Sequence, residues 1–190
     1  QIDTESFYGA NKLEKLVFLA VPDAPVDEVG LLETAAAAAD NLTLIANCFK
    51  GCTSLTEVTL PVRLSSFDIL AFSGCTSLEA IELPEALTTI SANAFKNSGL
   101  TSVNLPESLT SLAVSAFAGC NALQTVTTSR EGWRVDDTFL LDDENTLIFA
   151  FGNLGGKVTI PDGCVTIGEY AFNGREVSEV VFLSLIHISE

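Results

Sequence analysis

The most reactive side chains in this sequence are those of its five cysteines. Cys52, Cys75 and Cys120 each follow a phenylalanine by three positions, so we expect them to share one structural role. Two interpretations stay open: small apolar core residues, or a disulfide between Cys52 and Cys75. A bridge needs Cα atoms about 4.4–6.8 Å apart, and neighbouring strands about 4.8 Å apart meet that requirement. We expect no metal site, because no Cys-x-x-Cys pair exists and the single histidine, His187, lies near the end of the sequence.

A short acidic run, Asp142 to Asn145, carries the oxygen ligands that Ca²⁺ prefers. It lacks the Asp-x-Asp-x-Asp-Gly spacing of a calcium loop, and it separates two apolar segments. We therefore interpret it as the solvated tip of a turn. Asp136 and Asp137 receive the same interpretation.

No arrangement of residues points to catalysis. The sequence has no Gly-x-Ser-x-Gly motif and no glycine-rich phosphate loop, and His187 stands in a tail that does not follow the rest of the pattern. We predict a protein that is not an enzyme, with no catalytic residues and no cofactor. A Ca²⁺-dependent module or a carboxylate enzyme is the weaker alternative.

The overall charge limits the partners. Nine Lys and Arg residues stand against 25 Asp and Glu, which gives a formal net charge of −16. Such a surface repels phosphate backbones and anionic lipid, so we expect no nucleic-acid partner. No run of 18 apolar residues exists, so we expect no membrane insertion.

An internal repeat sets the elements that position all these residues. Phe49, Phe72, Phe95 and Phe117 are spaced by 23, 23 and 22 residues, and each is followed by a small turn. Outlying copies start at Phe7 and Phe172. After each turn come a leucine or valine, a segment with alternating apolar residues, usually a proline, and a second apolar pair.

Each repeat is therefore expected to form one coil of a stack. Period-2 alternation buries one face of the strand, and the proline ends the strand because it cannot donate to a ladder. One coil cannot bury its apolar side alone, but a stack shares a continuous core. The recurring phenylalanines are predicted to form an aromatic row along that core.

The repeated phrase Ala-Phe-x-x-Cys-x-x-Leu-x-x-Val-x-Leu-Pro-x-x-Leu-x-x-Ile resembles the BspA-like, or Treponema-type, leucine-rich repeat. Residues 44–126 match it closely, and 158–182 match through Ile160-Pro161 and Ala171-Phe172. The resemblance implies a curved, right-handed leucine-rich-repeat solenoid on a bacterial surface. It also implies adhesion to host matrix proteins or to other bacteria.

The whole chain is interpreted as a single array, residues 1–190, with two interruptions. Alanines and leucines between Asp27 and Asp40 predict a short helix, and apolar segments on both sides of Asp142–Asn145 predict a hairpin. The expected parts are a weak first repeat (6–18), a helical insert (19–43), regular repeats (44–127), a hairpin insert (128–157), a last repeat (158–182) and a non-repeat tail (183–190).

The best candidate for function is the row of strand residues that alternate with the buried ones, because they line one broad face. Trp133, in the insert, is interpreted either as an exposed anchor or as a residue that closes the edge of the core. The candidate binding residues are Glu57, Thr59, Glu82, Ser102, Asn104, Thr125, Thr127 and Trp133.

The expected function is a surface interaction module of an extracellular or cell-surface bacterial protein, binding a host or bacterial surface protein or a glycan. We expect a monomer. Because the sequence starts at Gln1 and lacks methionine, we expect a segment of a longer adhesin. A structural spacer within a larger surface protein is the alternative.

Overall fold

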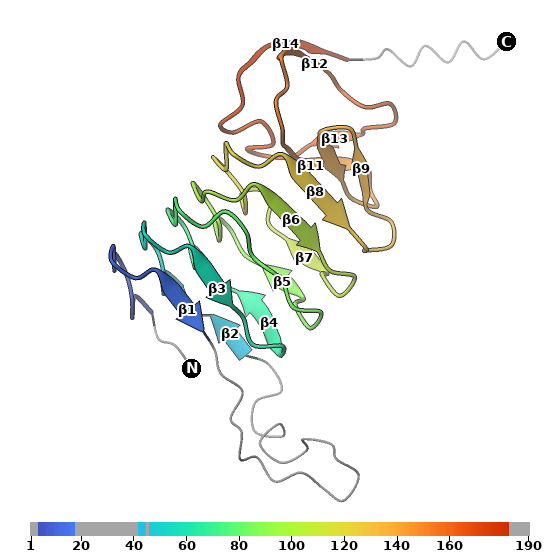
Figure 1. Ribbon diagram of the computed structural model, residues 1–190. Helices are drawn as coiled ribbons and strands as arrows, with labels where there is room; N and C mark the ends of the chain where they lie inside the picture. The colour runs from blue at the N-terminus through green and yellow to red at the C-terminus, as the bar shows by residue number, and fades with distance from the viewer. Residues whose placement is uncertain (1–3, 18–41, 45, 183–190) are drawn as a thin grey trace, which may run out of the picture.

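The computed structural model describes residues 4–17, 42–44 and 46–182. The chain winds into a β-solenoid of about five turns, with repeats of about 23 residues (Figure 1). No helix occurs among the described residues. The helix that we expect between Asp27 and Asp40 falls within 18–41, outside the residues that the structure describes.

One face of the solenoid, called the ladder face below, is built from parallel strand pairs. β1 (Lys15–Val17) pairs with β3 (Glu57–Thr59), and β6 (Ser102–Leu105) pairs with β8 (Thr125–Thr128). These strands are turned towards the viewer in Figure 1. Residues one repeat apart lie directly opposite each other in both pairs, so each column of the repeat becomes a row across the face.

A second face carries a four-stranded parallel sheet behind the ladder face. Its order is β2–β4–β5–β7. The strands are short, and each lies at the second apolar pair of its repeat. Their bounds are Leu42–Leu44 for β2, Leu64–Phe67 for β4, Thr89–Ile90 for β5 and Ser111–Leu112 for β7.

Prolines form the corner between the two faces. The backbone N–H of Leu64 donates to the carbonyl of Pro61 at 3.0 Å, and Leu87 and Leu109 repeat the bond to their own prolines at 3.0 and 3.1 Å. The proline ends the ladder segment, and its carbonyl closes a tight turn that redirects the chain. The corner predicted from the proline column is confirmed.

The insert after β8 supplies three strands of a four-stranded sheet. β10 (Phe139–Leu141) and β11 (Thr146–Ala150) form the predicted antiparallel hairpin. β9 (Arg134–Asp136) pairs antiparallel with β10, and β13 (Thr166–Ile167) pairs parallel with β11. The solenoid then resumes with β12 (Gly156–Thr159) and β14 (Val177–Val181), which pair in parallel.

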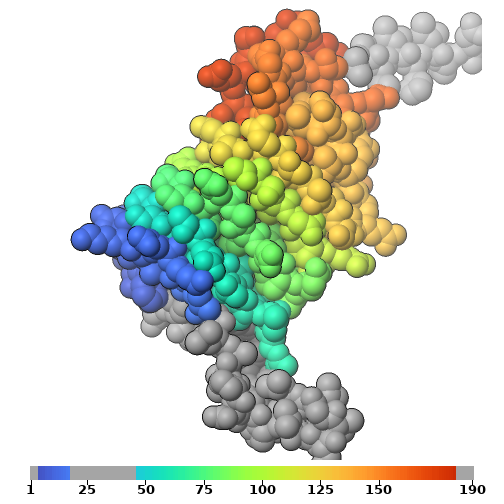
Figure 2. Space-filling view, viewed as in Figure 1, coloured from blue at the N-terminus to red at the C-terminus, as the bar shows by residue number. Residues whose placement is uncertain are grey.

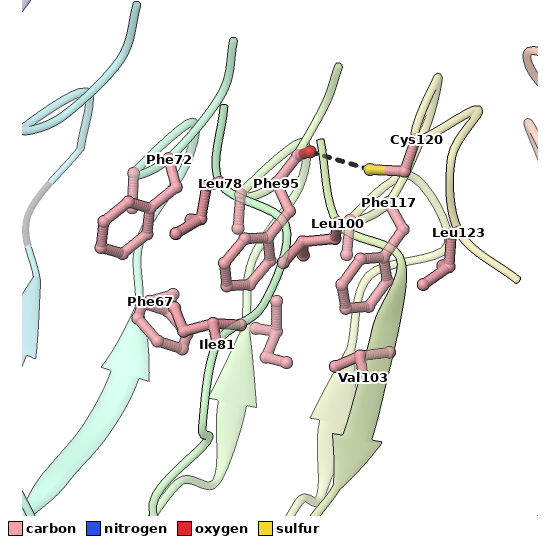
Figure 3. Close-up of a cluster of buried hydrophobic side chains, with 14 of the residues drawn as sticks. Phe67, Phe72, Leu78, Ile81, Phe95, Leu100, Val103, Phe117, Cys120 and Leu123 are labelled. Atoms are coloured by element: carbon pink, nitrogen blue, oxygen red, sulfur yellow. Dashed lines mark hydrogen bonds between the residues drawn. The ribbon is translucent and has the colours of Figure 1, made fainter. Parts of the chain in front are cut away.

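A row of stacked phenylalanine rings runs through the core. Ring centroids of Phe7, Phe49, Phe72, Phe95 and Phe117 follow one another at 5.2–5.8 Å, with interplanar angles of 5–12°. Figure 3 shows three of these rings side by side, with Leu78, Leu100 and Leu123 forming a parallel row. The predicted aromatic row is confirmed over these five repeats.

Phe172 departs from the predicted row. The ring that follows Phe117 is Phe149 of the hairpin, with its centroid 5.2 Å away. Phe172 instead packs edge-on against Phe139, with a centroid distance of 6.3 Å, in a separate small core. The expectation that the sixth repeat would continue the row was wrong, because the hairpin inserts a ring of its own there.

The turns after the phenylalanines also stack. Gly51 and Gly74 have φ values of 76° and 75°, which only glycine adopts without strain. A Cβ at Gly74 would lie 3.7 Å from the Cα of Gly51, and one at Gly174 would lie 3.0 Å from the Cα of Gly119. The turn of the last repeat therefore lies against the turn of the repeat that precedes the insert.

Candidate binding surface

The ladder face brings together the candidate binding residues of neighbouring repeats. Lys15 lies opposite Glu57, and Val17 lies opposite Thr59. In Figure 2, which has the same view, successive repeats cross this face as oblique bands of colour. The side chains of Glu57, Thr59, Glu82, Ser102, Asn104, Thr125 and Thr127 are all exposed.

Charged side chains connect the first two strands of this face. Lys15 Nζ lies 2.6 Å from Glu57 Oε1, and both side chains are more than half exposed. A solvated pair of this kind contributes little to stability, about 0–1 kcal/mol. Both groups therefore remain accessible to a partner of either charge.

Hydroxyl and amide groups replace the charges further along the face. Ser102 lies opposite Thr125, and Asn104 lies opposite Thr127. The hydroxyl of Thr127 donates to Asn104 Oδ1 at 2.9 Å. This part of the face offers hydrogen-bonding groups in fixed positions and no aromatic anchor.

The ladder is interrupted between β3 and β6. The segment 80–83 belongs to the strand column and keeps its alternation, with Ile81 only 7% exposed and Glu82 exposed. It nevertheless pairs with neither neighbour, and the ladder face consists of separate pairs. The strand that the alternation predicts at this position is absent.

The interruption coincides with a bulky core residue. Phe67 stands in a column that holds Ile90 and Leu112 in the next repeats. Its ring packs edge-on against Phe72 and Phe95, with centroids 5.8 and 5.2 Å away (Figure 3). The step from Phe72 to Phe95 is 5.8 Å, against 5.2–5.3 Å for the other three steps of the row, and it is the step that Phe67 packs against from both rings.

Trp133 lies at the edge of the main core. Its ring is half-buried and packs against the core cluster, and the guanidinium carbon of Arg130 lies 5.3 Å from the ring centroid. Of the two interpretations left open by the sequence, the structure favours the one in which Trp133 closes the core. Its indole is still partly accessible.

The acidic run after β10 forms a turn through one of its carboxylates. Asp142 Oδ1 accepts hydrogen bonds from the backbone N–H groups of Glu144 and Thr146, at 3.0 and 2.8 Å. This side chain therefore serves the hairpin itself. Among the described residues, no group of three or more His, Cys, Asp or Glu side chains comes together as metal ligands would.

All five cysteines are free thiols, and four of them are buried. Cys52, Cys75 and Cys120 donate to the carbonyls of Phe7, Phe49 and Phe95, with S···O distances of 3.0–3.2 Å; the last bond is the dashed line in Figure 3. Burial raises the pKa of Cys75 to about 12 and that of Cys48 to about 11. These thiols are core residues, as one of the two interpretations predicts, and the Cys52–Cys75 bridge is not formed.

The repeat pattern has a counterpart among known families. The family described as the BspA type leucine rich repeat region matches residues 43–138 and 148–190, in six copies. The chain belongs to the BspA-type leucine-rich-repeat family. The matched residues include the repeats that contain Phe49, Phe72, Phe95, Phe117 and Phe172.

Solved leucine-rich-repeat structures have a similar fold. A leucine-rich repeat protein from Eubacterium ventriosum has a TM-score of 0.57 at 18% identity, over 74% of this chain and 49% of that one. One from Bacteroides ovatus has a TM-score of 0.55 at 17% identity, over 95% of this chain and 63% of that one. A leucine rich cell surface protein from Faecalibacterium prausnitzii has a TM-score of 0.49 at 21% identity, over 74% and 56%.

The chain spans between about half and 63% of the length of these structures. No curated protein matches it. Within the described residues, no helix has the length and apolarity needed to cross a membrane.

One departure from the BspA-type repeat joins the insert to the solenoid. Arg175 stands in the column that holds Cys52, Cys75 and Cys120. Its guanidinium donates to the carbonyls of Cys120 at 2.9 Å, Ala150 at 3.1 Å, Gly152 at 3.3 Å and Asn121 at 3.4 Å. Sequence reasoning missed this role, although an arginine in a cysteine column was a visible signal.

Proposed function

We propose that this chain is a non-enzymatic interaction module of a bacterial cell-surface or secreted protein. It binds a protein or glycan partner through the ladder face and acts in adhesion. The location follows from what membership of the BspA-type family implies, and the choice of face follows from the arrangement of the side chains.

The observation that carries the proposal is the register of the exposed residues. Within each strand pair of the ladder face, equivalent positions of consecutive repeats lie directly opposite each other, as Lys15 and Glu57 do, and as Asn104 and Thr127 do. A repeat fold thereby spreads polar groups over a broad surface instead of gathering them in a deep pocket. Such a surface suits an extended partner.

Binding of a labelled chain to a panel of immobilised matrix proteins and bacterial surface glycans tests the proposal. A ladder variant with Glu57→Lys, Glu82→Lys, Asn104→Lys and Thr127→Lys is expected to lose at least tenfold in affinity for any partner that the panel reveals. These side chains are exposed, so the variant is expected to keep the wild-type thermal midpoint within a few degrees.

A control variant carries Glu169→Lys and Glu176→Lys, which are exposed and outside the candidate residues. It is expected to bind like the wild type. A panel without any binding partner, or equal losses in both variants, contradicts the proposal.

A structural spacer is the second candidate, and the regular stacking of five repeats favours it. A spacer needs its length and stiffness but not its outer side chains. Under this alternative, Glu57→Lys with Glu82→Lys leaves adhesion by the parent protein unchanged. Loss of adhesion in that variant, with the fold preserved, removes the spacer alternative.

A further inference from the structure

The unpaired segment 80–83 leaves a hollow in the ladder face. A depression of about 620 Å³ lies between β3 and this segment, and a smaller one of about 260 Å³ lies between the segment and β6. The segment 80–83 lines both hollows, and its Ala80 offers a single methyl group in the row that holds Glu57 and Ser102. The larger hollow follows the direction of the strands.

The walls of the hollow are the edge of β3 that faces away from β1 and the segment 80–83. In the described part of the chain, no backbone hydrogen bond joins 80–83 to β3 or to β6. The residue just before this segment, Glu79, accepts one at its carbonyl from the Thr101 N–H, at 2.9 Å. Unpaired strand edges donate hydrogen bonds to an extended chain that lies beside them and accept hydrogen bonds from it. The backbone of this hollow therefore favours an extended peptide over a compact ligand.

The hollow has an apolar lining and an acidic rim. Leu60, Ile81 and Leu83 lie along it, and Val62 is 80% exposed at one end. Glu57, Glu82 and Glu85 carry the charge, and within the described residues only Glu57 of these three forms an ion pair, with Lys15. The rim attracts cations, and the lining attracts apolar side chains.

We propose that this hollow binds an extended peptide segment of a partner protein in which basic and apolar residues alternate. The inference rests on the proposed function and names the chemistry of its partner. Side chains of an extended chain point alternately to opposite sides, so lysine or arginine residues reach the glutamates while the apolar residues between them cover Leu60 and Leu83. The lining segments, 56–60 and 80–85, have room for about five or six residues at roughly 3.3 Å each.

The test uses the whole chain and a capped, fluorescein-labelled peptide of sequence Lys-Val-Lys-Val-Lys-Val. Fluorescence anisotropy is expected to give saturable binding, whereas the peptide Glu-Val-Glu-Val-Glu-Val is expected not to bind. Glu82→Lys with Glu85→Lys is expected to weaken binding at least tenfold. The charge-matched control, Glu169→Lys with Glu176→Lys, is expected to remain within twofold of the wild type.

A second variant separates the hollow from general charge attraction. Ala80→Phe fills the hollow without changing the charge, and the exposed site tolerates the ring, so circular dichroism is expected to be unchanged. Peptide affinity is expected to fall at least tenfold. Hydrogen exchange is expected to slow at 80–83 when the wild type binds the peptide.

Three results overturn the inference: no binding of the basic peptide, full binding by Ala80→Phe, or equal weakening by both glutamate variants. Each is distinguishable from failure of the proposed function. If matrix proteins or glycans bind the ladder face while the peptide does not, only the hollow is refuted. If the peptide binds but the panel shows no partner, the wider proposal loses its support.

Discussion

Phe149 packs against Phe117 with ring centroids 5.2 Å apart and ring planes tilted by 39°, in the place where the phenylalanine of the next repeat would continue the row. The insert thus fills the core position that Phe172 leaves open. Phe149 is 5% exposed, whereas Phe172 is only half-buried. We expect Phe149→Ala to lower the free energy of unfolding by about 3–5 kcal/mol and Phe172→Ala to lower it by clearly less. Urea unfolding measures both, and the reverse order contradicts this assignment of the core.

Position along the row sets the cost of removing a ring. Phe95 is fully buried between two stacked rings, whereas Phe7 is 41% exposed at the end of the row. Phe95→Ala is expected to cost about 3–5 kcal/mol, as other buried phenylalanines do, and Phe7→Ala about 1–2 kcal/mol. Equal losses at the two sites, measured by urea unfolding, are incompatible with a solenoid whose end is less tightly packed.

Leu70 is held in a left-handed backbone conformation, with φ at 61°. The same column holds Asn47 and Asn93, with φ at 59° and 58°, and asparagine tolerates this region better than leucine does. Leu70→Asn is therefore expected to raise the free energy of unfolding by roughly 0.5–1 kcal/mol, and the thermal midpoint with it. Asn93→Leu is the reciprocal variant and is expected to lower it. A destabilised Leu70→Asn protein shows that packing of the leucine outweighs backbone strain.

Arg175 joins the insert to the preceding repeat through four carbonyl oxygens. Arg175→Met keeps much of the side-chain volume but removes the guanidinium donor from these four carbonyls, although that of Cys120 still accepts from the Leu123 N–H, and we expect a cost of about 1.5–3 kcal/mol. Arg134→Met is the control, because Arg134 is exposed and its guanidinium donates to Asn145 Oδ1 and the Asp162 carbonyl, both in exposed bonds. Equal unfolding midpoints for the two variants would refute a special role for Arg175.

The buried thiols make stability depend on pH in the alkaline range. The pKa of Cys75 is raised by burial from its ordinary value of 9.0 to about 12, so the folded state keeps the proton that the unfolded state releases above pH 9. Stability from this group is complete below pH 9 and falls as the pH rises towards 12, by up to about 1.4 kcal/mol per pH unit. Urea midpoints at pH 7 and 10 are expected to differ less for Cys75→Ala than for the wild type. An identical difference in both proteins contradicts the prediction.

Most of the solenoid could be predicted because each structural feature comes from a residue type that recurs at the same position of every repeat. Alternation at Val58 and Val103, the prolines at the corners, and the phenylalanines all appear several times in the sequence. The hairpin was predictable from two apolar segments on either side of Asp142. Each of these features is local or periodic.

The missed features depend on contacts between distant residues. Nothing local distinguishes Phe149 from other apolar residues of its strand, so its place in the aromatic row was not predictable. The unpaired segment at Ile81 keeps a strand-like alternation, and its separation from β6 accompanies a single larger ring, Phe67, in another coil. Among the candidate binding residues, Trp133 was ambiguous because a lone tryptophan suits a core edge and an interface equally well.

The contact between the turns at Gly119 and Gly174 has a practical consequence. These two positions lie against each other although 54 residues separate them, so the array continues its winding past the insert. The tip at Asp143 and Glu144 is exposed, which makes it a natural place to graft a foreign epitope or a short reporter sequence. The solenoid on either side would hold the grafted sequence in place, and the grafted sequence would determine what is bound.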